Sequence, residues 1–500
     1  MPCPVRGAVR WTVESAGIAS SFYANLFNVR LIGMLASRRQ RQPLHRTCLT
    51  AAVHTGMMFA LDKINIDNPG APSRDQADVA SAKANSPSCI VVLLLFIVAA
   101  TIGAMRKDVT QGFDEVAHAS YIAHLQHSGE MWPTFGAMRM LDPSTFRFSS
   151  EANYLNHPSP YYLLLAHLGP SLEGYPQAIL IYRLFNVALA AIGLAALMAI
   201  GLVAGLPRVT FYAYIVPMAC IPVLVSVAGA INNDNAAFAG GGIATLAAFQ
   251  LLATGSRGWL LAALAGVIVA SWAKFTGLLL SGGMVAGVLL WLLWHGRLPS
   301  RSIVLIAVAA LLASAPYLAL FAQYGSPAPM TPGELAMIKR DAHAVGWDSA
   351  ARLTPASYAA HFVTEFVLEW MPTLKPRSAL NYAALAIPIM AALCALAGIL
   401  LAVRRIAHAE ARPLDIVVAA GAVAFSVTFL LHGIFSYNLH TEFGWLTSAY
   451  PRYYLPLAAL FPLAGLSLLA AVRQPPTRAV LLAFLIAGPL VFSLLGQSFG

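Results

Sequence analysis

The amino-acid sequence predicts an all-α polytopic membrane protein with about eleven transmembrane helices and two long outer loops that contain juxtamembrane helices. The chain is 58% hydrophobic and only 10% charged, whereas soluble domains carry about 25% charged residues. Its mean hydropathy is +0.69. The apolar residues also recur in windows long enough to cross about 30 Å of hydrocarbon. These three observations exclude an ordinary soluble enzyme.

The apolar windows define a transmembrane domain over residues 88–497. The eleven windows lie near residues 88–105, 179–205, 209–230, 234–254, 258–273, 276–296, 302–323, 379–403, 413–436, 451–472 and 479–497. A further apolar segment, 160–170, is short and bounded by prolines. We expect an interfacial or re-entrant helix there, because it is too short to span.

Residues 1–87 differ from the rest in composition. They are polar, basic in patches such as SRRQRQ at 37–42, and without sustained periodicity. They lack the compact apolar stretch that a cleavable signal peptide needs near its start. We expect either a poorly ordered cytoplasmic tail or a gene model that begins upstream of the true initiator methionine.

The charged residues between the windows predict the orientation of the spans. With a cytoplasmic amino terminus, the connections on that side carry nine arginines against one acid, Glu410, and the opposite short connections carry only Asp234, Lys274 and Glu442. This is the asymmetry of the positive-inside rule. The nine are Arg208, Arg257, Arg297, Arg301, Arg404, Arg405, Arg412, Arg473 and Arg478.

The same orientation places both long loops, 106–178 and 324–378, outside. Arg106 and Lys107 follow the first window on the outer side and run against the rule, but nine arginines outnumber these two. The formal net charge of +10 then reflects membrane topology, and we expect no nucleic-acid partner.

The first outer loop begins with a group of titratable residues, GFDEVAHASYIAHLQHSGE at 112–130. If this stretch is helical, Asp114, His118 and Tyr121 share one face, and Glu115 lies one turn from His118. A carboxylate beside an imidazole suits a general base or half of a metal site. The alternative is a solvated amphipathic helix. We expect His124 and His127, which point elsewhere, to be interfacial.

Two more polar clusters interrupt the apolar sequence. In NYLNHPSPYY, 153–162, the prolines place Asn156 and His157 at a helix start near the membrane surface, as ligand-binding groups or as a cap and turn. In INNDNAAFAGG, 231–241, Asn232, Asn233 and Asp234 lie between two windows. A capped tight turn needs fewer Asn and Asp residues than this. The glycines at 240–242 lie within a span, so we interpret them as a packing feature.

Three basic residues lie beside or inside apolar windows: Arg183 in IYRLFN, Lys274 in SWAKFTG and Arg452 in SAYPRYYLP. Ionisable groups in membrane segments are functional candidates by default, with snorkelling to the headgroups as the alternative. Arginine can hold a phosphate through two parallel hydrogen bonds. Because 114–118, 156–157, 231–235, 274 and 452 all map to the outer side, we expect them to form one site.

In this order and on this one side, FDEVAH, NHPSPYY, NNDN, AKFTG and PRYYLPL resemble the GT-C superfamily of membrane glycosyltransferases over residues 88–472. Its members include protein O-mannosyltransferases and the lipid A aminoarabinose transferase, and bacterial families of this fold with no assigned activity. The resemblance implies an inverting transfer from a polyprenyl-phosphate sugar to a hydroxyl of a cell-envelope glycan, lipid or protein. It also implies location in the plasma (inner) membrane with the active site on the outer face.

The resemblance also implies roles for the candidate residues. Asp114 matches the first-loop acid that acts as base, and Glu115 is the second catalytic candidate. The other roles are acceptor or donor binding by His118, Asn156, His157, Asn232, Asn233 and Asp234, lipid-phosphate binding by Lys274, Arg452 and Arg183, and a divalent cation at Glu115, His118 and His157.

Two other functions remain open at this stage. A transporter or flippase for a lipid-linked saccharide would spread polar residues through the depth of its spans and often shows repeated halves. Here the polar residues gather at one face and no repeat is evident, which favours the enzyme. In a third reading, the chain is a non-catalytic relative whose outer loops form a binding surface.

Overall fold

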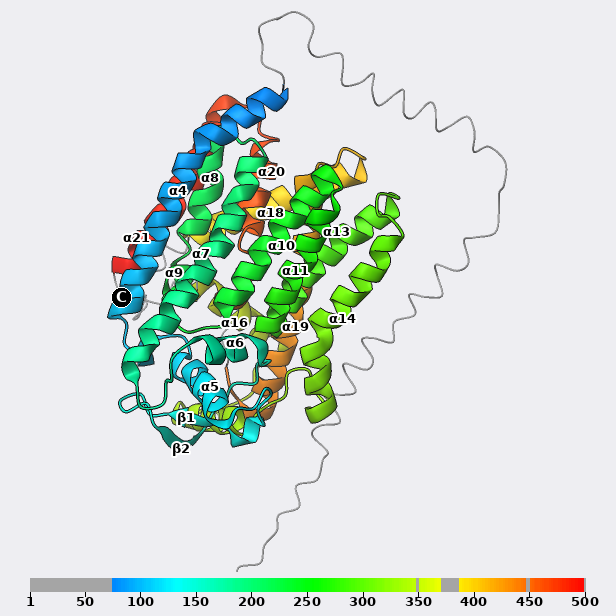
Figure 1. Cartoon of the computed structure of the whole chain (residues 1–500). Coiled ribbons are helices and arrows are strands. Elements are labelled where there is room, and N and C mark those ends of the chain that lie inside the picture. The colour runs from blue at the N-terminus through cyan, green and yellow to red at the C-terminus, as the bar shows by residue number, and fades with distance from the viewer. Residues whose placement is uncertain (1–73, 348–349, 370–385, 447–449, 499–500) are drawn as a thin grey trace, which may run out of the picture.

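The computed structural model describes residues 74–347, 350–369, 386–446 and 450–498. Long helices form a bundle, and shorter elements gather at one end of it (Figure 1). We call this end, where α5 (Glu115–Ser128), α6 (Pro160–Leu168) and the hairpin β1–β2 lie, the loop end. Buried hydrophobic residues form one core cluster inside the bundle and a second beneath the loop-end elements.

Eight helices of the described chain are long and apolar enough to cross a membrane. They are α4 (Arg74–Arg106), α7 (Ile179–Val203), α10 (Asp234–Thr254), the continuous helix of α12 (Phe275–Gly277), η5 (Leu278–Gly282) and α13 (Gly283–Trp294), α14 (Arg301–Tyr324), α18 (Ala386–Ala407), α19 (Pro413–Phe443) and α21 (Pro475–Ser498). The chain is an integral membrane protein.

Two bent helix pairs bring the count to ten if each pair is one span. They are α8 (Arg208–Ala219) with α9 (Pro222–Ala228), bent by 56°, and the 3-10 segment η6 (Pro451–Leu457) with α20 (Leu460–Leu469), bent by 58°. Within the described residues the count is thus eight to ten, and the predicted number of about eleven is not confirmed. The one predicted window that is neither a candidate span nor part of a bent pair is 258–273. It corresponds to α11 (Arg257–Ala273), which has only 17 residues because the chain becomes extended at Lys274.

Helix α10 lies at the centre of the bundle. Of its span window, 78% is buried, against 17% for α4, and it packs against α7, α11 and η6. The glycine triplet makes these contacts close. A Cβ atom on Gly240 would lie 2.4 Å from the Ala270 nitrogen, one on Gly241 2.4 Å from the Pro456 oxygen, and one on Gly242 2.6 Å from the Gly193 oxygen. The predicted packing role of 240–242 is confirmed.

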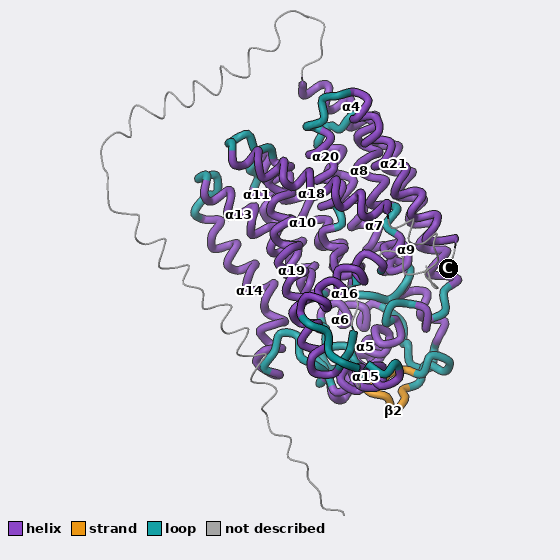
Figure 2. Tube along the Cα trace, turned by 180° about the vertical axis from the view of Figure 1, so that it is seen from behind, coloured by secondary structure: helices purple, strands orange, loops and turns teal. Residues whose placement is uncertain are grey.

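The loop end adds short elements to the bundle. Strands β1 (Arg139–Leu141) and β2 (Phe148–Ala152) pair antiparallel, so the all-α prediction misses a small sheet. Asp142 forms the turn between them by accepting hydrogen bonds from the Ser144 and Thr145 backbone. The remaining elements here are η2 (Val109–Gln111), η3 (Phe135–Ala137), η4 (Pro176–Ala178), α15 (Pro332–Ala344) and α16 (Pro355–Leu368). Figure 2 shows α15 and β2 at this end from behind.

Two expectations about segment boundaries can be compared with the structure. The apolar segment 160–170 is the nine-residue helix α6 and is not among the candidate spans. The predicted tail, 1–87, lies outside the described residues up to residue 73, and from Arg74 on the chain is helical. The Asn85 side chain donates to the Leu206 oxygen at 2.7 Å, so the predicted boundary at 87 falls inside a packed helix.

Candidate functional site

Asp114 ends the connection between α4 and α5 at the loop end. It occupies the N-cap position of α5 with φ 58°, a left-handed conformation that is uncommon outside glycine. Its carboxylate accepts hydrogen bonds from Arg452 Nη2 at 2.5 Å and from the Tyr154 hydroxyl at 3.0 Å. Its side chain is 37% exposed. Asp114 is thus an accessible carboxylate held by a cation in a strained backbone position, which is typical of functional sites.

The residues on either side of Asp114 are fixed by the segment 231–232. The Asn232 side chain donates to the Phe113 oxygen at 2.9 Å, and the Ile231 backbone N–H donates to Glu115 Oε1 at 2.8 Å. These two hydrogen bonds hold the chain immediately before and after the carboxylate.

Glu115 and Arg183 form a buried ion pair with each other. Arg183 donates to both carboxylate oxygens, at 2.8 and 2.7 Å, and its Nη1 donates to the Ala104 and Lys107 oxygens, both at 2.8 Å. Glu115 is fully buried. The two residues thus hold α4, α5 and α7 together. Contrary to the prediction, neither Glu115 nor Arg183 is placed to reach a substrate or a lipid phosphate.

Lys274 and Arg452 meet at Asp234. Lys274 lies in the extended break between α11 and α12, where φ is −159°, and its Nζ donates to Asp234 Oδ1 at 2.8 Å. Arg452 Nε lies 3.7 Å from Asp234 Oδ2. The side chains of Lys274 and Arg452 are only 8% and 6% exposed. The order of charges is therefore Asp114, Arg452, Asp234, Lys274, alternating in sign.

Aromatic rings surround the two cations. Lys274 Nζ lies 3.5 Å from the centre of the Tyr453 ring. The Arg452 guanidinium lies 5.1 to 5.4 Å from the rings of Phe113, Tyr450 and Tyr453. Such contacts stabilise cations that have lost hydration.

Several polar atoms of this network are buried without a hydrogen-bond partner: Arg452 Nε and Nη1, and Asp234 Oδ2. Buried polar groups are nearly always paired, and an unpaired charged donor is costly. Arg452 Nε still faces the Asp234 carboxylate at 3.7 Å, so it is the N–H groups of Nη1 that favour binding of an anion such as a phosphate.

His118 and His157 lie next to the charge network. His118 Nδ1 is 2.8 Å from the Tyr162 hydroxyl, and the His118 and His157 rings are stacked with centres 6.0 Å apart. The Tyr121 hydroxyl donates to the His157 oxygen at 3.2 Å. The predicted shared face of Asp114, His118 and Tyr121 is thus oriented toward this cluster.

Asn156 lies on the side of the site formed by the second long loop. Its amide donates to the Pro329 oxygen at 3.0 Å and to Glu334 Oε2 at 3.3 Å. Glu334 stands in the first turn of α15, capped by Thr331. The hydrogen bond between Asn156 and Glu334 joins the two long loops of the chain.

The titration of three groups follows from these surroundings. Burial opposes ionisation of Asp114, but the charge of Arg452 and the hydrogen bonds from Arg452 and Tyr154 outweigh it and lower the pKa of Asp114 to about 2. Burial lowers the pKa of His118 to about 3, against the attraction of Asp114. Burial raises the pKa of Glu334 to about 7. At neutral pH Asp114 is ionised and His118 is neutral.

The proposed metal ligands do not form a coordination set. Both oxygens of Glu115 accept hydrogen bonds from Arg183, and His118 Nδ1 is paired with Tyr162. Among the described residues, no group of three or more His, Cys, Asp and Glu side chains is arranged to hold a metal ion. Glu115, His118 and His157 therefore do not fit the divalent cation suggested by the sequence.

No family model matches the sequence, and no curated protein matches it either. Its structural neighbours include two crystal structures of ArnT from Cupriavidus metallidurans. The apo structure has a TM-score of 0.44 and 17% sequence identity, and the match covers 80% of this chain and 62% of that one. The structure bound to undecaprenyl phosphate has a TM-score of 0.42 and 16% identity, with 78% and 61% covered.

The chain thus spans less than two thirds of the length of these ArnT structures.

Three residues of the site were not among those predicted from the sequence. Tyr154 binds Asp114, Tyr453 packs on Lys274, and Asn186 accepts hydrogen bonds from the Tyr161 hydroxyl and the Asn235 amide. Asn186 could have been found as a polar residue inside an apolar helix. Tyr154 and Tyr453 lie within the quoted motifs, but only the fold shows what they contact.

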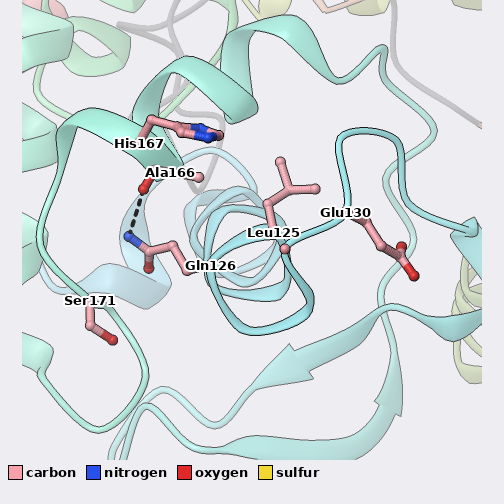
Figure 3. Close-up of a pocket in the computed structure, with 7 residues that line it drawn as sticks. Leu125, Gln126, Glu130, Ala166, His167 and Ser171 are labelled. Carbon is pink, nitrogen blue, oxygen red and sulfur yellow. Dashed lines mark hydrogen bonds between the residues drawn. The ribbon is translucent and has the colours of Figure 1, made fainter.

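His124 and His127 lie away from the charge network, as predicted. His124 Nε2 is 3.7 Å from a Glu130 oxygen, and His127 Nδ1 is 3.0 Å from a Glu173 oxygen. A surface pocket between α5 and α6 is lined by Leu125, Gln126, Gly129, Glu130, Ala166, His167 and Ser171. In Figure 3, Gln126 points into it and donates to the Ala166 oxygen at 3.3 Å. This pocket holds none of the predicted site residues.

Proposed function

We propose that this chain is a membrane glycosyltransferase that transfers a sugar from a polyprenyl-phosphate donor to a hydroxyl outside the membrane, with inversion at the anomeric carbon. The supporting observation is the charge network at the loop end. It combines an accessible carboxylate, Asp114, with two buried cations, Lys274 and Arg452, and with guanidinium N–H groups that have no hydrogen-bond partner.

The reaction is a single displacement. The acceptor oxygen attacks the anomeric carbon, its proton passes to the Asp114 carboxylate, and the bond between that carbon and the lipid-phosphate oxygen breaks. The bonding electrons stay on the phosphate. Lys274 and Arg452 stabilise the negative charge that develops there. One displacement inverts the configuration, so no enzyme nucleophile is needed.

Arg452 holds the Asp114 carboxylate in this structure, and a base engaged in this way accepts a proton poorly because its pKa is about 2. We propose that the donor phosphate competes with Asp114 for the guanidinium. The carboxylate is then released toward the acceptor, and its pKa rises because the nearby positive charge is neutralised. In this mechanism, binding of the donor activates the base.

The proposal also includes the orientation of the chain in the membrane. The amino-terminal end of α4 and the loop end lie at opposite ends of the bundle in Figure 1. With the arginine-bearing connections in the cytoplasm, the site would open on the outer face of the plasma membrane. The acceptor would be a glycan, lipid or protein of the cell envelope.

The test uses the full chain in lipid nanodiscs with a panel of labelled polyprenyl-phosphate sugars and cell-envelope extract as the acceptor source. We expect Asp114→Asn to lower transfer by about 10² to 10⁴-fold, the range of a general base. The same variant should bind undecaprenyl phosphate more tightly than wild type, since the competing carboxylate charge is gone. His124→Ala, on the same helix but outside the network, is the matched control.

Two results would contradict the proposal. Full turnover by Asp114→Asn would remove the carboxylate from catalysis. Movement of a lipid-linked sugar across the bilayer by the wild type, with no glycosidic product, would identify a flippase.

A further inference from the structure

We infer that residues 231–235 are a clamp that sets the position of the base relative to the phosphate-binding lysine, and that Asn232 and Asn233 are positioning residues for opposite halves of the site. This inference rests on the proposed function, and it differs from the substrate-binding role that the sequence suggested for the two asparagines. We call these five residues the clamp.

The first half of the clamp holds the base. Asn232 Nδ2 donates to the Phe113 oxygen, the carbonyl just before Asp114, at 2.9 Å. The Ile231 N–H donates to Glu115 Oε1, just after it, at 2.8 Å. Asp114 itself has φ 58°, a conformation that costs free energy for most residues and persists only where the surroundings impose it. The two hydrogen bonds anchor the backbone just before Asp114 and the side chain just after it.

The second half holds the cation. Asn233 Nδ2 donates to the Ala273 oxygen, the carbonyl just before Lys274, at 2.8 Å. Ala273 is the last residue of α11, so its oxygen has no partner within the helix. Asp234 then binds the ammonium group of Lys274 at 2.8 Å. Neighbouring residues of one segment therefore fix the backbone and the side chain of the lysine.

The clamp is itself anchored in the bundle. Asn235 Nδ2 donates to the Val227 oxygen at 3.0 Å and to Asn186 Oδ1 at 3.1 Å, and the Asp234 N–H donates to Asn232 Oδ1 at 2.8 Å. Asn232, Asn233, Asp234 and Asn235 are all between 0% and 1% exposed. Side chains this deeply buried act on the reaction through the residues they hold.

The two asparagines form a matched pair for an experiment. They are adjacent, both buried, and each donates one amide hydrogen bond to a backbone oxygen; Asn232 differs in also accepting the Asp234 N–H. A purely structural role predicts the same effect for both alanine substitutions. The clamp predicts losses in two different quantities, turnover for one variant and lipid binding for the other, because one asparagine holds the base and the other holds the phosphate-binding lysine.

The experiment measures turnover and undecaprenyl-phosphate binding for the full chain in nanodiscs. Asn233→Ala should weaken binding of this lipid about tenfold, the equivalent of one lost hydrogen bond. Asn232→Ala should lower kcat about tenfold and leave the Kd for the lipid within about twofold. Asn85→Ala is the control, because the buried Asn85 amide also donates to a backbone oxygen, that of Leu206 at 2.7 Å, far from the site. It should change neither quantity.

A second measurement does not depend on transfer. Amide hydrogen exchange should rise in Asn232→Ala for peptides covering 110–118 and in Asn233→Ala for peptides covering 272–278. If both variants loosen the same peptides, or both change the same kinetic quantity, the clamp is wrong. If wild type neither binds undecaprenyl phosphate nor transfers sugar while the exchange pattern is split as expected, the proposed function fails and the positioning of the two segments stands.

Discussion

Asp114 and Glu115 are adjacent in the sequence and alike in chemistry, yet their surroundings give them different roles. Glu115 is fully buried and bound to Arg183, whereas Asp114 is 37% exposed and bound to Arg452. A buried, fully paired carboxylate fixes structure, whereas an accessible one suits the role of base that we propose for Asp114. The sequence identified both carboxylates as candidates. In the structure the backbone at Asp114 is left-handed, and the two side chains have different partners.

Glu334 is a second carboxyl group whose titration the structure makes testable. The pKa of Glu334 in the folded protein is about 7, above its usual value of 4.5. Between these two pH values the folded state keeps a proton on Glu334 that the unfolded state has lost. The stabilising contribution is thus fully present below about pH 4.5 and is lost as the pH rises through about 7. We expect the Tm of the wild type to fall more between pH 5.5 and pH 8 than the Tm of Glu334→Gln.

The difference in Tm between the wild type and Glu334→Gln isolates the contribution of Glu334 to the pH dependence of stability. Burial lowers the pKa of His118 and of His157, and such groups change stability in the opposite sense, because the unfolded state binds more protons at low pH. Their contribution cancels in the difference between wild type and variant. An identical pH dependence of Tm in both proteins would show that Glu334 titrates normally.

At the scale of elements, the glycine triplet of α10 lets three neighbours approach its backbone. Gly240 faces α11, Gly241 faces η6, and Gly242 faces α7. The sequence predicted packing at this place because glycines within a membrane helix permit close contact. It could not indicate that η6, which carries Arg452, is one of the partners.

Gly241→Ala tests this contact. The new Cβ would lie 2.4 Å from the Pro456 oxygen, so α10 and η6 must separate. We expect a loss of roughly 1–3 kcal/mol in stability, as for other overpacked cores, and a loss of lipid-phosphate binding as Arg452 shifts. Thermal unfolding in detergent and a lipid-binding assay would measure both.

Gly258→Ala, in the first turn of α11, is the control for this substitution. A Cβ there would meet only the Ser256 Oγ, at 3.6 Å. Its stability should match or slightly exceed that of wild type, since alanine favours helix more than glycine does. Equal stability of the two alanine variants would contradict the close packing at Gly241.

The helical windows of the sequence were largely sufficient to locate the elements. Periodicity and length predicted the spans and the short helix at 160–170, because a membrane helix needs a continuous apolar stretch. They did not reveal the β1–β2 hairpin, whose strands have three and five residues and depend on a local turn at Asp142. They also counted 258–273 as a full span, although the corresponding helix α11 has only 17 residues.

At the scale of the whole molecule, the pair of Glu115 and Arg183 joins segments that are far apart in the chain. Through hydrogen bonds to Ala104, Lys107 and Ile231 it connects the end of α4, the start of α5, α7 and the start of α10. The sequence marked both residues as functional candidates because charges in membrane segments usually are. Their arrangement instead supports assembly of the bundle.

Arg183→Ala should therefore destabilise the whole protein. Removing one partner of a buried ion pair costs about 3–5 kcal/mol, because the other charge is left unpaired. Arg340→Ala is a suitable control, since Arg340 pairs with Glu151 on the surface and is 63% exposed; exposed pairs contribute about 0–1 kcal/mol. Thermal unfolding in detergent would compare them, and a similar Tm for both variants would contradict the structural role.

The sequence by itself determined the membrane class, the approximate helices and the common side of the polar clusters, because these depend on local composition and length. The tertiary structure decided which charges pair. Asp114 meets Arg452 across 338 residues, and Lys274 meets Asp234 across 40. Helical periodicity gives each residue a face on its own helix, but only packing of the helices against one another brings two such faces together.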